Sequence, residues 1–425
     1  MTYEQIAPLL GKAFQSGIMP IVLRYFITFS PLMLLVVLAL FIFPDVWMRY
    51  IRMKNFLSLK YTLLELKLPK DTWKSPLAME TILVSIHNTS DGSKFSQYWK
   101  GETRPWYSLE ICSFEGQVKF FAWTEDRRKS NLMSAFYSQY PGIEIYERED
   151  YSRTVQFDPE KIRVHAMEFK FNKPDPYPIK TYIDYGLDKD PKEEFKIDPL
   201  THMIEWLGSL RPNEEVWFQY IVRAHVKEQR KAGTLWTKTD KWKDEAEAEV
   251  NKILLRDPKT KVAGVINPDT GFAKLPTISE GERDIVSAIE HSISKLPFDV
   301  CIRAMYVAPK ETFDTPFGIG GRISSLKQFN TEHLNGFRPN GDRWHMKIDE
   351  PWTDYKNMRR NFFAKVSLKA YRRRSAFYPP YKSPTLILNT EELATIYHLP
   401  GSVSATPGLE RVPSKKAEAP TNLPV

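Results

Sequence analysis

Cysteine is scarce in this chain, whose 425 residues include only Cys112 and Cys301. Two cysteines cannot build the disulfide framework of a small secreted domain, nor a cysteine-rich zinc site. Both lie inside runs of residues that predict β-strands. We therefore expect buried free thiols in a reducing compartment, which favours the cytoplasm for this part of the chain.

The sequence also lacks the motifs of common catalytic and cofactor sites. Gly318-Ile-Gly-Gly321 is glycine-rich, but no Gly-Lys-Ser/Thr follows it and no strand of a βαβ unit precedes it, so we interpret it as a turn. The eight histidines are scattered, and the closest pair, His333 and His345, fits no metal-ligand spacing. No Gly-x-Ser-x-Gly elbow occurs. We expect no metal, no cofactor and no catalytic residue; an enzyme with an unfamiliar site is the least favoured alternative.

One long stretch without charge stands out near the N-terminus, from Tyr25 to Pro44. About 20 helical residues cross the roughly 30 Å hydrocarbon core of a bilayer, so the stretch predicts a transmembrane helix at 25–47. The alternatives are a buried core helix, which would need a polar face, and a cleaved signal peptide, which would need a small-x-small site after it. The residues that follow show no such site.

Basic residues next to this helix predict its orientation. Arg49, Arg52, Lys54 and Lys60 follow it, whereas few basic residues precede it. The positive-inside rule places the N-terminus outside and the C-terminal body in the cytoplasm, on the inner membrane. The same four residues are expected to face anionic lipid.

Composition and hydrophobic periodicity predict an α+β body with real cores. The chain is 42% hydrophobic and 13% aromatic, with a net charge of +8. Residues 61–173 read β-α-β-β-α-β, the ferredoxin-like order, and residues 174–310 repeat it with an insertion, beginning with a strand at Ile179–Tyr185. The sequence predicts an N-terminal extracytoplasmic segment (1–24), the transmembrane helix (25–47), a basic segment (48–60), two α+β modules (61–173 and 174–310), a helical segment (311–399) and an extended or disordered tail (400–425).

A basic helix is predicted at Met358–Ala376, in the helical C-terminal segment. Its candidate binding residues recur at helical spacing or follow directly, and they are Lys365, Lys369, Arg372, Arg373 and Arg374. Such a stripe suits phosphate groups of nucleic acid or lipid, or an acidic protein partner. A solvated face whose aromatic residues pack inward would have the same pattern, and it is the default interpretation.

Several phrases carry a resemblance to a known family, among them Lys100–Trp106, Arg374–Pro380 and Leu388–Pro400. The chain resembles an uncharacterised bacterial family of single-pass membrane proteins, a domain of unknown function, over nearly its whole length. Its late phrases are also similar to the segment that leads into the motor domain of conjugative coupling-protein and HerA-like ATPases. No Walker motif follows them in this chain. The resemblance therefore implies association with a type IV secretion-like or DNA-transfer apparatus, without ATP hydrolysis by this chain.

Together these observations predict a non-enzymatic, membrane-anchored structural or adaptor subunit. It would dock a separate motor ATPase, or other secretion components, at the cytoplasmic face of the membrane, where an oligomer is also conceivable. The alternative is a membrane-tethered nucleic-acid-binding module that uses the basic helix.

Overall fold

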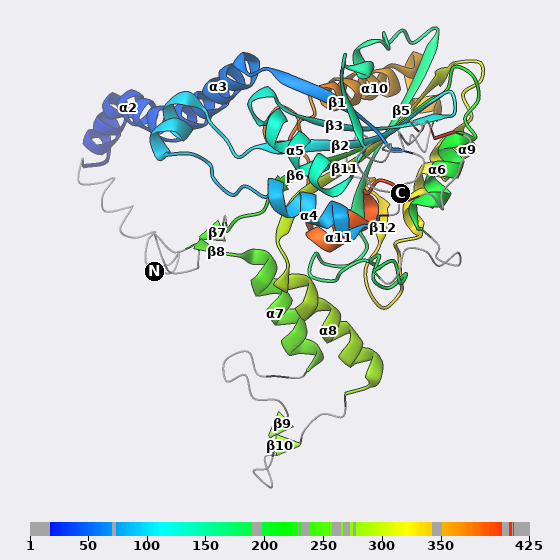
Figure 1. The fold of residues 1–425 in the computed structure, drawn as a ribbon. Helices are drawn as coiled ribbons and strands as arrows, with labels where there is room; N and C mark the ends of the chain where they lie inside the picture. Colours follow the sequence, from blue (N-terminus) through cyan, green and yellow to red (C-terminus); the bar gives the residue numbers. More distant parts are fainter. Residues whose placement is uncertain are drawn as a thin grey trace, which may run out of the picture. The chain divides into compact units, whose positions relative to one another are not determined.

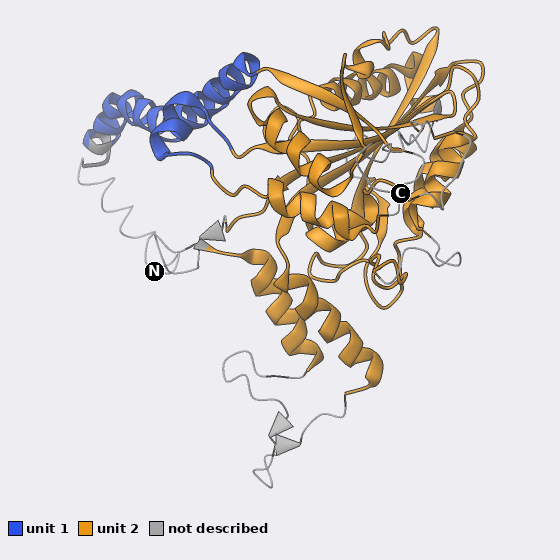
Figure 2. Cartoon of the chain, viewed as in Figure 1, with its two compact units in different colours: residues 1–59, 91–103 blue, residues 60–90, 104–425 orange. Residues whose placement is uncertain are grey.

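The structure is a computed structural model that describes most of the chain. The described residues are 18–69, 74–188, 198–227, 229–230, 238–254, 256, 265–266, 273–274, 278–341, 351–401, 408–409 and 411. They form two compact units, coloured separately in Figure 2. Unit 1 contains residues up to Leu59 together with Asp91–Thr103, and unit 2 contains the rest.

Unit 1 is built on one long helix. Its parts are α2 (Ile18–Val37), a π-helical turn (Leu38–Ile42) and α3 (Phe43–Ser58). Pro44 lacks the N–H that would bond to the preceding turn, which accounts for a widened turn at this place. The stretch Leu23–Ser58 has a mean hydropathy of 2.7 in its most apolar window, and no residue of that window is buried. The predicted apolar helix is thus confirmed; a membrane anchor and a signal sequence are both compatible with it.

Unit 2 is organised around one nine-stranded sheet (Figure 1). The strands in chain order are β1 (Tyr61–Lys67), β2 (Trp106–Phe114), β3 (Gln117–Glu125), β4 (Glu144–Arg148), β5 (Ile162–Phe171), β6 (Glu215–Ala224), β11 (Pro297–Pro309), β12 (Phe337–Pro339) and β13 (Leu386–Asn389). Their spatial order is β12-β5-β11-β6-β2-β3-β1-β4, and β13 also pairs with β11. All these pairings are antiparallel. Two short hairpins, β7 (Gln229–Arg230) with β8 (Lys238–Thr239) and β9 (Val265–Ile266) with β10 (Ala273–Lys274), lie outside the sheet.

The α+β class predicted from the sequence is confirmed, but the strands do not form a separate sheet for each predicted module. Strand β2 pairs with β6 along its whole length and joins the two halves. The strand predicted at Ile179–Tyr185 is wrong, since the chain makes turns there. Asp184 accepts a hydrogen bond from the Thr181 N–H at 2.8 Å, and Ile179 and Tyr182 are buried, which accounts for the misleading apolar pattern.

The two faces of the sheet carry different helices (Figure 1). One face is covered by α4 (Leu77–Ile86), α5 (Lys129–Gln139), α6 (Leu200–Gly208), α9 (Thr315–Lys327) and α11 (Thr390–Ile396), whose buried side chains share one apolar core with the strands. Helix α10 (Met358–Arg372) packs on the other face. Burial of apolar surface at about 25 cal/mol per Å² makes the five-helix face the main source of stability.

Helices α7 (Lys241–Ile253) and α8 (Glu280–Ser294) pack on each other as a hairpin between β6 and β11, with a small core of their own. Local capping fixes where three helices begin: Asp240 accepts a hydrogen bond from the Lys243 N–H at the start of α7, and Ser279 and Glu282 form a capping box at the start of α8. A second capping box, formed by Asn389 and Glu392, starts α11. These local signals were readable because each depends on residues three positions apart.

The glycine-rich stretch Gly318–Gly321 lies inside α9, so its interpretation as a turn is wrong. Close packing explains the glycines better than backbone freedom. A Cβ on Gly321 would lie 1.9 Å from the Trp206 ring, and one on Gly318 would lie 2.2 Å from the Tyr306 ring. Gly320 faces open space. The glycines let α9 approach α6 and β11.

This packing predicts opposite effects for two neighbouring alanine substitutions. Gly321→Ala should lower the free energy of unfolding by about 1–3 kcal/mol, because the new methyl group overpacks against Trp206. Gly320→Ala, with nothing within 4 Å of the new Cβ, should raise it by about 0.5–1 kcal/mol. Thermal unfolding of both variants in detergent measures the difference. Equal effects of the two substitutions would refute the close-packing account.

Candidate functional site: buried ionic network and exposed aromatic surface

The sheet face beneath α10 is unusually polar for a buried surface. Along β2, Leu109 and Ile111 point into the apolar core, whereas Ser108, Glu110 and Cys112 alternate to the other side. All five side chains are fully buried. Charges so deep in a protein are tolerated only when they are paired and hydrogen-bonded, so the partners of each charge decide what this face can do.

Arg374 is the centre of this face. Its side chain is 0% exposed, and its Nε lies 2.7 Å from Glu110 Oε1 while its Nη1 lies 2.8 Å from Asp150 Oδ2. Glu110 also accepts hydrogen bonds from the Tyr151 hydroxyl at 2.7 Å and from Gln219 Nε2 at 3.0 Å. Burial alone would raise the pKa of Asp150, but the Arg374 charge and hydrogen bonds outweigh it and lower that pKa. Arg374 and Glu110 are fully buried in this network, and the Asp150 side chain is 15% exposed.

A second ion pair lies further along the same face. Arg303 Nε is 2.8 Å from Glu168 Oε1, and Arg303 Nη2 donates to Ser383 Oγ at 2.8 Å. A hollow lined in part by Glu168, Arg303 and Tyr371 adjoins it, with a volume of about 10 Å³. That volume holds about one water molecule, far below the several hundred Å³ of small-molecule sites.

A third cluster fastens the root of the α7–α8 hairpin to the sheet. Asp299 Oδ2 lies 2.7 Å from Arg223 Nη2, and Asp299 Oδ1 lies 2.6 Å from His225 Nδ1. His225 Nε2 is 3.3 Å from Asp240, the N-cap of α7. Burial lowers the pKa of His225, but the hydrogen bond and charge of Asp299, aided by Asp240, outweigh burial and raise it. His225 thus links the strand end at Asp299 to the start of α7 at Asp240. We call this cluster the His225 clamp.

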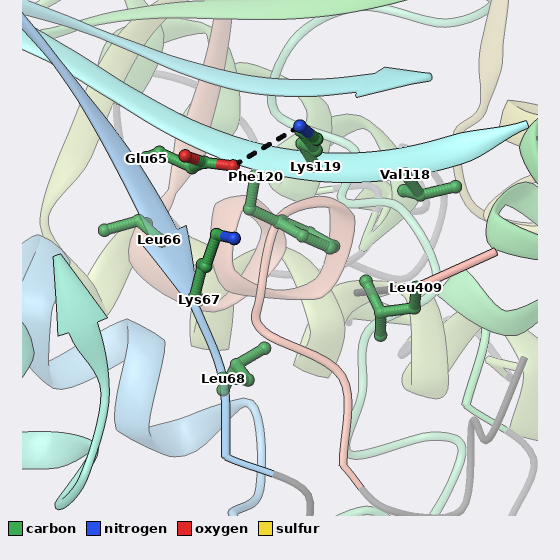
Figure 3. A pocket seen from close by; sticks show the side chains of 8 residues that line it. All are labelled: Glu65, Leu66, Lys67, Leu68, Val118, Lys119, Phe120 and Leu409. Atoms are coloured by element: carbon green, nitrogen blue, oxygen red, sulfur yellow. Dashed lines mark ion pairs between the residues drawn. The ribbon is translucent and has the colours of Figure 1, made fainter. Parts of the chain in front are cut away.

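Figure 3 shows a further hollow, where the end of β1 lies beside the start of β3. Leu68, Val118, Phe120 and Leu409 lie along it, and the Glu65–Lys119 ion pair (3.8 Å) crosses its upper side. Its volume is also about 10 Å³, so it admits no organic ligand. Leu409 bridges to Val118, which attaches part of the segment predicted as an extended tail to the sheet.

The cysteine prediction is confirmed in its structural part, since Cys112 and Cys301 are free and buried. Cys112 Sγ donates to the Tyr151 hydroxyl at 3.0 Å. Burial raises the pKa of the Cys112 thiol well above its usual value, so the thiol stays protonated and unreactive. Among the described residues, no group of three or more His, Cys, Asp or Glu side chains is arranged to hold a metal ion; His345 lies outside them.

The five cations predicted on the basic helix do not share one face. Lys365, Lys369 and Arg373 are exposed. Arg372 is half-buried and donates to the backbone oxygens of Ser152 and Val155. Arg374 lies beyond the end of α10 and is fully buried, so it is not on the exposed side of the helix with the other cations. Spacing could not reveal this, because the carboxylates that hold Arg374 come from distant parts of the chain.

An exposed apolar surface extends from the residues just before α10 into its first turns, and the sequence analysis did not predict it. We call it the aromatic surface; its residues are Trp352, Tyr355, Met358 and Phe362, with exposed fractions of 81%, 70%, 64% and 63%. Lys356 and Arg359 beside them are exposed too. Asp354, the only acidic residue among 351–362, is buried and accepts from the Arg359 and Arg360 N–H groups. The surface is therefore apolar with a basic rim.

Three of the four predicted lipid-facing cations are exposed. Arg49, Lys54 and Lys60 have exposed side chains, whereas Arg52 is half-buried. Arg49 pairs with Asp45 at 2.8 Å on the same exposed helix face. Lys60 belongs to unit 2, and the other three belong to unit 1.

Comparison with known proteins assigns the chain to a family. A family model described as a domain of unknown function, DUF8128, matches residues 57–411. The chain belongs to the DUF8128 family. The match includes every strand of the main sheet and all three ionic clusters, and it leaves most of the apolar helix outside. No curated protein matches the chain.

Replacing Arg374 should strongly lower the free energy of unfolding of this DUF8128 protein. Arg374→Met leaves the fully buried Glu110 without its cation, which should cost about 3–5 kcal/mol of unfolding free energy. Arg373→Met, on the exposed neighbour, should change it by less than about 0.5 kcal/mol. Chemical denaturation in detergent gives both values. Similar values for the two variants would contradict the central place of Arg374.

The His225 clamp should make stability depend on pH. Because the folded-state pKa is raised, its contribution is fully present below the unfolded value of about 6.5 and is lost as the pH rises through the folded value. His225→Gln should therefore cost about 1.5–3 kcal/mol at pH 5.5 and less at pH 8.5. His202→Gln, exposed on α6, is the control and should change neither value. A pH-independent cost of His225→Gln would argue against an ionised clamp.

Proposed function

We propose that the chain is a non-enzymatic adaptor, anchored in the inner membrane by its N-terminal helix, whose body docks a motor ATPase at the cytoplasmic face. The observation that carries the proposal is the apolar stretch Leu23–Ser58, exposed throughout its most apolar window. At about 1.5 Å per residue, its 36 residues are longer than the roughly 30 Å hydrocarbon core. Exposed Arg49 and Lys54 on its C-terminal side favour the cytoplasmic orientation.

The internal order of the sheet supports a finer view of the body as two related ferredoxin-like modules. The order β4-β1-β3-β2, with α4 and α5 as connections, recurs as β12-β5-β11-β6 with α6 and α9. In this interpretation the α7–α8 hairpin is an insertion between β6 and β11, the second and third strands of the second module in chain order. The second module would then begin at β5, earlier in the chain than residue 174.

We assign the docking role to the aromatic surface. Exposed Trp, Tyr, Met and Phe side chains are the kind that dominate protein–protein binding energy when they enter a partner's pocket. Its basic rim suits a partner whose apolar pocket is surrounded by carboxylates. The link to a motor ATPase of a type IV secretion-like or DNA-transfer apparatus comes from the resemblance of the late phrases alone.

The nucleic-acid alternative rests on the exposed cations Lys365, Lys369 and Arg373. Three phosphate contacts would give a modest dependence on salt, with a slope of log K against log salt of roughly −3. Burial of Arg374 and the backbone hydrogen bonds of Arg372 remove two of the five cations on which this function depended. The adaptor function is therefore the better supported of the two.

Co-isolation tests the adaptor proposal. The full-length chain in detergent should retain a co-expressed motor ATPase encoded in the same genome, whereas Trp352→Ser with Phe362→Ser should weaken its binding at least 30-fold, the loss of about 2 kcal/mol expected of an aromatic anchor. Leu77→Ser with Tyr137→Ser, exposed on α4 and α5, is the matched control. Failure of the wild-type chain to bind any motor ATPase, or equal binding by both double variants, would refute the proposal; salt-sensitive DNA binding lost on Lys365→Glu would favour the alternative.

A further inference from the structure

A segment remote in sequence is part of the same compact unit as the apolar helix. Residues 91–103 leave unit 2 after α4, join unit 1 and return to form β2 (Figure 2, blue). A π-helical turn, Ser96–Lys100, lies at its centre. We call residues 91–103 the return segment. Its contacts with α3 are specific.

Three contacts seat the return segment on α3. Trp47 Nε1 donates to the Tyr98 backbone oxygen at 3.0 Å, and the Trp47 and Trp99 rings meet edge to face at 5.8 Å. Asn55 Nδ2, two helical turns further along α3, donates to the Gly101 oxygen at 3.1 Å.

Gly101 makes the closest approach. It has a φ of +71°, and a Cβ there would lie 2.5 Å from the Ile51 backbone oxygen. Only glycine fits this position without moving the two backbones apart. The backbones of the return segment and α3 are therefore in close contact at Gly101. The return segment lies beside residues 47–55 of α3, at the same level along the helix axis.

That depth can be estimated from the helix itself. The apolar run ends at Pro44, and Trp47 lies three residues beyond it, which is about 5 Å along the helix axis. The headgroup region extends roughly 5–8 Å beyond each side of the hydrocarbon core. If the apolar run crosses the hydrocarbon core, Trp47 and the Trp99 ring that meets it lie at the level of the phospholipid headgroups.

The free face of the return segment has the composition of an interfacial element. Phe95, Tyr98 and Trp99 are 63%, 55% and 63% exposed although they are aromatic. Lys94 and Lys100 flank them and are exposed as well. Aromatic rings with basic neighbours are enriched where hydrocarbon meets headgroups.

We infer that the return segment is a second membrane contact, in which Phe95, Tyr98 and Trp99 lie at the boundary between headgroups and acyl chains and the two lysines meet anionic lipid. This inference rests on the proposed anchoring of α2 and α3. It adds that the chain contacts the membrane through two segments, the apolar helix and the return segment. The partner is the phospholipid bilayer itself.

Site-specific fluorescent labelling of the full chain in vesicles of phosphatidylcholine and phosphatidylglycerol tests the inference. Both native cysteines are at most 2% exposed, so Phe95→Cys can be labelled selectively with an environment-sensitive probe. We expect strong quenching by a nitroxide attached near the lipid headgroup, and several-fold less quenching by aqueous iodide than for the free probe–cysteine adduct. Adding Gly101→Val should release the segment and restore iodide quenching.

A probe at Leu34→Cys, in the middle of the apolar helix, separates this inference from the anchoring proposal. Quenching of the Leu34 probe by deep lipid nitroxide, with full iodide access at position 95, would overturn the interfacial role and leave the anchor intact. Full iodide access at both positions would refute the anchor itself. Unchanged lipid quenching at position 95 after Gly101→Val would show that the probe inserts without the contacts to α3, which also overturns the inference.

Discussion

The structure of this DUF8128 protein depends on the pairing of β2 with β6. All nine residues of β2 lie opposite β6, and this ladder turns two halves of the chain into one sheet. Glu110 faces Gln219 across it, and Arg374 holds Glu110 from the C-terminal side of α10. The arginine therefore ties together both halves of the sheet, the turn at Asp150 and the segment after α10.

This arrangement explains why one face of the sheet is apolar and the other is ionic. The apolar face, under five helices, supplies the burial that stabilises the fold. The ionic face contributes little net stability, because desolvation offsets much of the attraction between buried charges. Its contacts hold α10 and the segment that follows against the sheet, through the Arg374–Glu110 ion pair and the hydrogen bond from Arg303 to the Ala370 oxygen. The aromatic surface lies at the start of the helix that these contacts attach to the sheet.

Local signals in the sequence predicted the local structure well. These signals are the apolar run at Tyr25–Pro44 and the strand-like runs around Cys112 and Cys301, which depend on neighbours within a few positions. Contacts between residues far apart in the sequence could not be predicted from local patterns. Gly321 was taken for a turn because the approach of Trp206 leaves no trace nearby, and Arg374 was taken for a binding residue because Glu110 lies 264 positions away. The aromatic surface was missed for the same reason, since the sequence around Trp352 does not indicate whether another element covers it.

Retention of the apolar helix in the mature protein distinguishes a membrane anchor from a signal sequence. Its C-terminal part is bound to the return segment by Trp47, Ile51 and Asn55, so it belongs to the folded molecule. The decisive measurement is the intact mass of the full-length chain recovered from bacterial membranes after washing with alkaline carbonate. We expect an uncleaved chain that stays in the membrane pellet. A shortened chain that begins after Pro44 and is released by carbonate would show a signal sequence and contradict the anchor.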